Sequence, residues 1–88
     1  MVSVFSKEGL EPLVRLLCSH DVTLYSTGGT YAYIKDIGLP VRSVEDLTGY
    51  PGILGGRVKT LHPKVFGGIL SRRDQNEDVQ ELERYEIP

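Results

Sequence analysis

The stretch VTLYSTGGTYAYIKDIG, from Val22 to Gly38, decides the fold class. Its first residues, through Ser26, are β-branched and aromatic enough to predict a β-strand. Thr30 to Ile37 then reads as a short helix, and Gly38 follows where a helix C-terminus favours glycine. A strand that passes through glycines into a helix is the basic unit of an α/β sheet.

The flanking segments continue the alternation of strand and helix. Val2 to Phe5 is a short β-prone run, Gly9 to His20 carries apolar residues at helical spacing, and Pro40 to Val44 is a plausible third strand. Strands that alternate with helices at this spacing require parallel pairing and right-handed crossovers. The sequence therefore predicts an α/β fold with a parallel sheet of about three strands.

The second half of the chain follows a different pattern. Glu45 to Gly56 is rich in Asp, Thr, Gly and Pro, which predicts a functional loop. His62 to Leu70 is expected to be helical in spite of two internal glycines, and Asp74 to Tyr85 to be a surface helix with a narrow apolar stripe. Six acidic side chains are expected to form a solvated face there: Asp74, Glu77, Asp78, Glu81, Glu83 and Glu86.

Size and composition restrict the possibilities further. With 88 residues and a net charge of −2, the chain makes one domain at most, and we treat residues 1–88 as part of a single domain. No apolar run is long enough for a membrane span, so a cytoplasmic location is expected.

The lone Cys18 continues an apolar series on the first helix and is interpreted as a packing thiol. His20 and His62 do not form a metal site, and a structural role is favoured for His62.

A phosphate site is predicted around YSTGGT, Tyr25 to Thr30. The turn and the helix N-terminus would present unpaired N–H groups, and the side chains of Ser26, Thr27 and Thr30 would add hydroxyl donors. Ser6 and Lys7 occupy the same kind of place after the first strand, and the carboxyl ends of adjacent parallel strands open onto one edge. The alternative interpretation is a capped glycine turn that holds no ligand.

A second candidate site lies in GGRVKTLHP, Gly55 to Pro63. From Arg57 to Arg73 there are five Lys or Arg and no Asp or Glu. Arg57 offers a planar fork, Lys59 a charge or a proton, and Thr60 a hydroxyl, which suits the non-phosphate half of a small molecule. Val58 stands where a nucleotide-hydrolase P-loop needs glycine, and negative net charge disfavours nucleic acid.

The chain resembles the N-terminal inosine monophosphate cyclohydrolase domains of the bifunctional purine biosynthesis family, which are methylglyoxal-synthase-like proteins. The matching motifs are SVFSKEG, STGGT, EDLTGYP, GGRVKTLHPKVFGGIL and the following RRD, and they cover almost the whole chain in order. STGGT is shared loosely with methylglyoxal synthases and with a regulatory domain of carbamoyl phosphate synthetase. GRVKTLHP is much more specific to the cyclohydrolase.

The resemblance implies a three-layer α/β domain with a parallel sheet, which closes the ring of 5-formamidoimidazole-4-carboxamide ribotide to inosine monophosphate (IMP) with loss of water. No metal or redox cofactor is implied, and the full-length family members are expected to be homodimers. Family active-site residues beyond Pro88 are absent here, so the chain is not expected to turn over substrate alone. By motif position, the phosphate site comprises Ser6, Lys7, Thr27, Gly28, Gly29 and Thr30, and the base-side site comprises Arg57, Val58, Lys59 and Thr60.

Lys59 is the predicted catalytic residue, which would polarise the carboxamide or formyl group. Two other functions compete with this one. A non-catalytic, allosteric nucleotide- or phosphate-binding module needs Lys7 and the glycine turn but gives Arg57, Lys59 and Thr60 no task. Methylglyoxal synthase would need its own pattern of catalytic carboxylates and histidines, which is not found.

Overall fold

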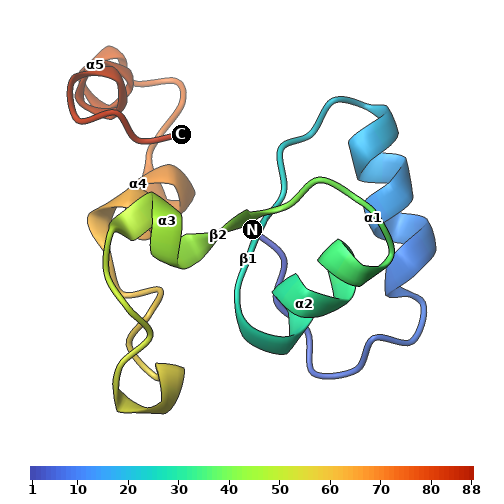
Figure 1. The fold of residues 1–88 in the computed structure, drawn as a ribbon. Coiled ribbons are helices and arrows are strands. Elements are labelled where there is room, and N and C mark those ends of the chain that lie inside the picture. Colours follow the sequence, from blue (N-terminus) through green and yellow to red (C-terminus); the bar gives the residue numbers. More distant parts are fainter. The chain divides into compact units, whose positions relative to one another are not determined.

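The computed structural model describes all residues from Met1 to Pro88, which form two compact units, Met1–Asp46 and Leu47–Pro88. The first unit contains helix α1 (Leu10–Ser19), strand β1 (Tyr25–Ser26), helix α2 (Gly28–Asp36) and strand β2 (Arg42–Ser43) (Figure 1). Helix α3 (Val44–Thr48) begins there. The second unit contains the short 3₁₀ helix η1 (Leu54–Gly56) and helices α4 (Pro63–Leu70) and α5 (Asn76–Arg84).

The sheet is parallel, as predicted, but its strands are short. β1 pairs with β2 in the register Tyr25↔Arg42 and Ser26↔Ser43, and Val2 forms an isolated parallel bridge with Ser26. β1 therefore lies between Val2 and β2. The α/β class and the order strand, helix, strand are confirmed.

The predicted first strand, Val2 to Phe5, is wrong beyond Val2. The Val2 N–H donates to the Tyr25 carbonyl at 2.8 Å, as in a sheet. The Thr30 hydroxyl then takes both backbone groups of Val4, because Oγ1 accepts from the N–H at 3.2 Å and donates to the carbonyl at 3.0 Å. A side chain thus replaces the ladder, and regular pairing stops.

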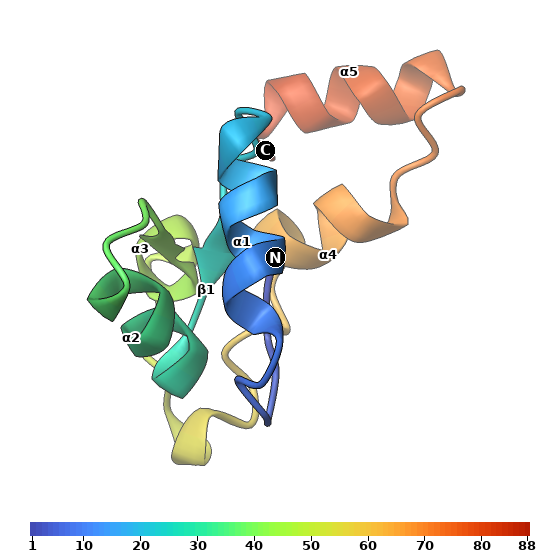
Figure 2. The same ribbon diagram turned by 90° about the vertical axis from the view of Figure 1, so that its right-hand side faces the viewer.

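The two helices of the first unit match their predicted bounds closely. Gly9, at φ 74°, precedes α1, and Pro12 falls in its first turn, where a missing N–H costs little. α2 begins at Gly28, slightly before the predicted start, and Gly38 follows it at φ 83°. Leu10 and Val14 of α1 form one buried cluster with Leu24 and Ile34, so both helices contribute to the core of this unit. Figure 2 shows the ribbons of α1 and α2 from another side.

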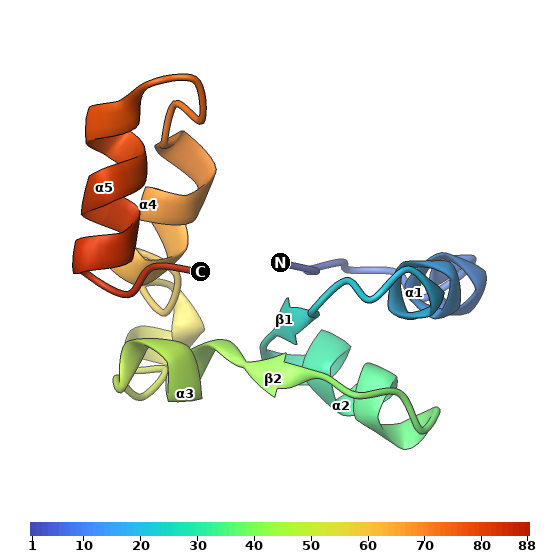
Figure 3. The same ribbon diagram turned by 90° about the horizontal axis from the view of Figure 1, so that it is seen from above.

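In the second unit, His62 caps α4 and confirms the structural role favoured for it. Its Nδ1 accepts from the Lys64 N–H at 3.0 Å, and Pro63 occupies the first helical position. The glycines within α4 leave room for the end of the chain. A Cβ on Gly67 would lie 2.8 Å from Cδ1 of Ile87. Figure 3 shows the loop that joins α4 to α5.

Two expectations for the second half need correction. The segment Glu45 to Gly56, predicted as a loop, includes most of α3 and the whole of η1. Asp78 does not belong to a purely solvated face, because its carboxylate accepts from the backbone N–H of Arg72 at 2.8 Å and from the Arg72 guanidinium at 3.1 and 2.9 Å.

No helix has both the length and the apolar character needed to cross a bilayer.

Candidate functional site at the carboxyl end of β1

The N-terminus of α2 forms a corner directly after β1. Thr27 is the N-cap residue, in an extended conformation, and its side chain makes no cap hydrogen bond to the first turn. Gly28 has φ 58°, which is the left-handed region that favours glycine. Gly28 and Gly29 are exposed, so backbone N–H groups at a positive helix end are accessible here.

Lys7 lies beside this corner, as the sequence predicted. Its Nζ is 3.7 Å from the point that a Cβ on Gly29 would occupy. The ammonium group is held there by hydrogen bonds to the carbonyls of Val4, at 3.1 Å, and Phe5, at 3.3 Å. An ammonium has three donors, so one remains for a ligand. A fixed positive charge at a helix N-terminus is a suitable environment for an anion.

The three hydroxyl groups expected to donate to a ligand donate to other parts of the protein. Ser26 donates to the Val2 carbonyl at 2.8 Å, Thr27 donates to Glu45 Oε1 at 2.6 Å, and Thr30 donates to the Val4 carbonyl. All three residues are buried. Because each hydroxyl has one proton, none of the three is a free donor in this structure, and that part of the interpretation is corrected. The exposed Ser6 accepts from the Glu8 N–H at 3.3 Å and keeps its hydroxyl proton.

The base-side residues lie in the second unit, around η1. Arg57 is exposed, and its Nε donates to the Leu54 carbonyl at 2.8 Å, which fixes the inner end of the guanidinium and leaves its terminal nitrogens free. Val58, Lys59 and Thr60 are half-buried. The Lys59 side chain folds back toward Gly56, with Nζ 3.2 Å from the point that a Cβ there would occupy. Gly56 has φ 76°, in the left-handed region that favours glycine.

Two members of the basic stretch have structural roles. Arg72 pairs with Asp78, and Arg73 donates to the Gly68 carbonyl at 3.0 Å, near the end of α4. Arg72 lowers the pKa of Asp78 to about 2, mainly through its side-chain hydrogen bond and then through its backbone N–H. By contrast, Arg57 and Lys59, the two charged residues predicted for the base side, keep charges that are available to a ligand.

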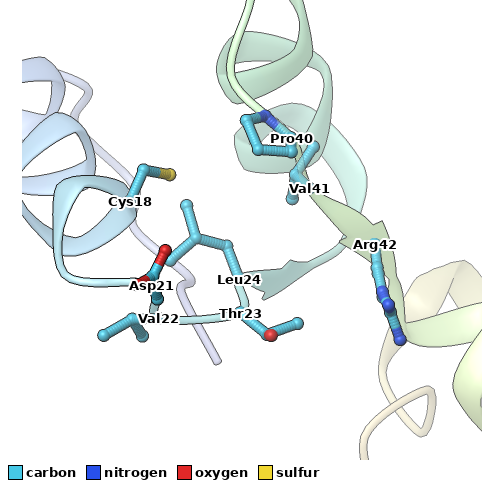
Figure 4. A pocket seen from close by; sticks show the side chains of 8 residues that line it. All are labelled: Cys18, Asp21, Val22, Thr23, Leu24, Pro40, Val41 and Arg42. Atoms are coloured by element: carbon cyan, nitrogen blue, oxygen red, sulfur yellow. The ribbon is translucent and has the colours of Figure 1, made fainter.

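A separate depression lies at the amino ends of the strands. It has a volume of about 400 Å³ and is lined by residues of the segments that lead into β1 and β2, together with Cys18 of α1 (Figure 4). Cys18 is half-buried and packs against the core cluster, in agreement with the packing role predicted for it. The strands' other ends carry Thr27 and Glu45, so the depression is not part of the corner.

Glu45 is the one residue of the corner that the sequence does not single out. The sequence predicts a loop at this position, and the contact of Glu45 with Thr27 joins two segments eighteen positions apart. The available signal is its place in the motif EDLTGYP. The structure brings no three His, Cys, Asp or Glu residues together in a way that could hold a metal ion.

The fold and this corner define an α/β domain with a glycine-containing strand-to-helix turn. A family model described as "MGS-like domain" matches residues 9–88, and the chain belongs to that family. It is 58% identical over its whole length to "Bifunctional purine biosynthesis protein PurH" of Bacteroides thetaiotaomicron, and 45% identical over 87 residues to the protein of the same name from Halalkalibacterium halodurans.

The chain spans 17% of the length of each of these two relatives. It is also similar to a solved structure, "Crystal structure of ForH", with a TM-score of 0.83 and 42% identity. That likeness covers 96% of this chain and 44% of the other. A likeness over almost the whole chain supports the α/β architecture described above.

Proposed function

We propose that this chain supplies the phosphate- and base-binding loops of an IMP cyclohydrolase in a bifunctional purine biosynthesis enzyme. The observation that carries the proposal is the position of Lys7 Nζ over Gly29 at the uncapped N-terminus of α2. Phosphate is the group that such a corner suits best. The relatives' names, and the identity to them over almost the whole of this chain, support a role in purine biosynthesis.

In the proposed reaction, the carboxamide nitrogen of 5-formamidoimidazole-4-carboxamide ribotide attacks the formyl carbon. A C–N bond forms and the formyl C–O bond breaks. The formyl oxygen leaves as water with two protons, one given up by the carboxamide nitrogen and one by the formamido nitrogen. Lys59 would donate to the formyl or carboxamide oxygen and stabilise the charge that develops there. Arg57 would hold the heterocycle with its free terminal nitrogens, while Thr60 and the backbone of Val58 would complete the base-side contacts.

The test is a calorimetric titration of the chain with IMP and, separately, with inorganic phosphate. We expect Lys7→Ala to lower the affinity for both ligands about tenfold, because it removes a hydrogen bond to a charged group. Lys59→Ala should lower the affinity for IMP by a similar factor and leave the affinity for phosphate unchanged. The matched control is Lys35→Ala, which removes an exposed lysine near the far end of α2.

A non-catalytic phosphate-binding module is the second candidate, and Lys7 at the corner favours it equally. It gives a different result, because Lys59→Ala would then leave the affinity for both ligands unchanged. If Lys7→Ala had no effect on either ligand, both functions would be wrong.

A further inference from the structure

The contact between Thr27 and Glu45 affects how the corner receives an anion. Thr27 is 5% exposed, and its Oγ1 donates to Glu45 Oε1 at 2.6 Å. A threonine at the N-cap usually accepts from an N–H of the first helical turn and satisfies it. Here the side chain makes no such bond, and its hydroxyl donates to the Glu45 carboxylate.

Glu45 is held in place by the sheet. The register pairs Ser26 with Ser43, so Thr27 and Glu45 follow the two paired strands at the same edge. Val44, at the start of α3, is fully buried, and Ser43 Oγ accepts from the Asp46 N–H at 3.0 Å, which fixes the first turn of that helix. The carboxylate is therefore presented to Thr27 by fixed backbone rather than by a mobile loop.

We propose that Glu45 is a positioning residue that keeps the anion corner open, by holding the Thr27 hydroxyl away from the N–H groups of α2. The inference rests on the proposed function, because it assumes that those N–H groups bind phosphate. The expected effect of this carboxylate on anion affinity is opposite to the effect of its charge alone. A carboxylate close to an anion site lowers affinity through its charge, whereas a carboxylate that prevents self-capping raises it.

The experiment measures the affinity for inorganic phosphate, with the backbone amide signals of Gly29 and Thr30 followed by NMR. Glu45→Ala should lower phosphate affinity about fivefold, because the freed hydroxyl caps the helix and competes for the same donors. Its amide signals should shift even without phosphate. Glu45→Gln keeps an acceptor oxygen for Thr27 and should retain wild-type affinity within about twofold.

Thr27→Val tests the route through the hydroxyl. In that background no hydroxyl is available to cap the helix, so Glu45→Ala should no longer lower phosphate affinity. Two results overturn the inference: tighter phosphate binding by Glu45→Ala than by wild type, or an equal loss of affinity on Glu45→Ala with and without Thr27→Val.

These results are separable from a failure of the proposed function. If the wild-type chain binds phosphate and Lys7→Ala loses it, the phosphate site on which the proposed function rests stands whatever the Glu45 variants do. If the wild-type chain binds no phosphate, both the proposed function and the role of Glu45 are overturned.

Discussion

The Lys7 ammonium nitrogen lies 3.7 Å from the point that a Cβ atom on Gly29 would occupy. The end of the first segment and the beginning of α2 thus form one surface, although helix α1 and strand β1 lie between them in the chain. The absence of a side chain at position 29 is what leaves the lysine and the helix N–H groups open to the same ligand.

Gly29→Ala should therefore reduce phosphate affinity while the fold is kept. A contact of 3.7 Å is ordinary van der Waals distance, and the lysine end is flexible, so the methyl group is accommodated. It would nevertheless stand between the ammonium group and the turn. Calorimetric titration with phosphate checks the affinity, and far-UV circular dichroism checks the fold. A variant that binds phosphate as wild type does would contradict this account of the corner.

Gly28→Ala should act on stability instead. Gly28 has φ 58°, and a Cβ in the left-handed region costs roughly 1 kcal/mol or more. We expect the free energy of unfolding to fall by about that amount in urea denaturation. Equal stability of Gly28→Ala and wild type would mean that α2 starts in another conformation.

His62→Ala should destabilise the second unit. Its Nδ1 is the acceptor for the Lys64 N–H, and loss of an N-cap costs about 1 kcal/mol. His62→Asn keeps an acceptor at the cap and should recover most of the stability, as measured by urea denaturation. If asparagine were no better than alanine, the cap would not be the reason for the histidine.

The Arg72–Asp78 pair should make stability depend on acid. The folded pKa of Asp78 is lowered from 3.8 to about 2, so its contribution is present above the unfolded pKa and is lost as pH falls through the folded value. Asp78→Asn should be less stable than wild type at neutral pH, and the difference should vanish below about pH 2. Urea denaturation over this pH range measures it. The control is Glu77→Gln, an exposed neighbour on α5. A pH-independent difference would exclude the ionised pair as its cause.

The helices were predictable because their signals are local. These signals act within a few residues of the helix ends that they fix. They are the glycines at positive φ before α1 and after α2, the proline in the first turn of α1, and the His62-Pro63 start of α4. Lys7 and the glycine turn could be brought together in advance, because adjacent parallel strands end at one edge. That Lys59 joins the same ligand stays a prediction.

The strand lengths and the hydrogen-bond partners were not predictable. Val2 to Phe5 has the composition of a strand, but the Thr30 side chain occupies the backbone groups of Val4. Likewise, the sequence offers Thr27 as a cap or a ligand donor, and only the pairing of β1 with β2 places Glu45 within 2.6 Å of it.

The sequence by itself determined the α/β class, the helices and the corner where a lysine meets a glycine turn. These follow from backbone preferences and from hydrophobic periodicity, which act over short distances along the chain. Only the tertiary structure decided where each hydroxyl proton and each carboxylate goes. A polar side chain bonds to whichever partner folding brings within reach, and that partner can lie in a distant segment.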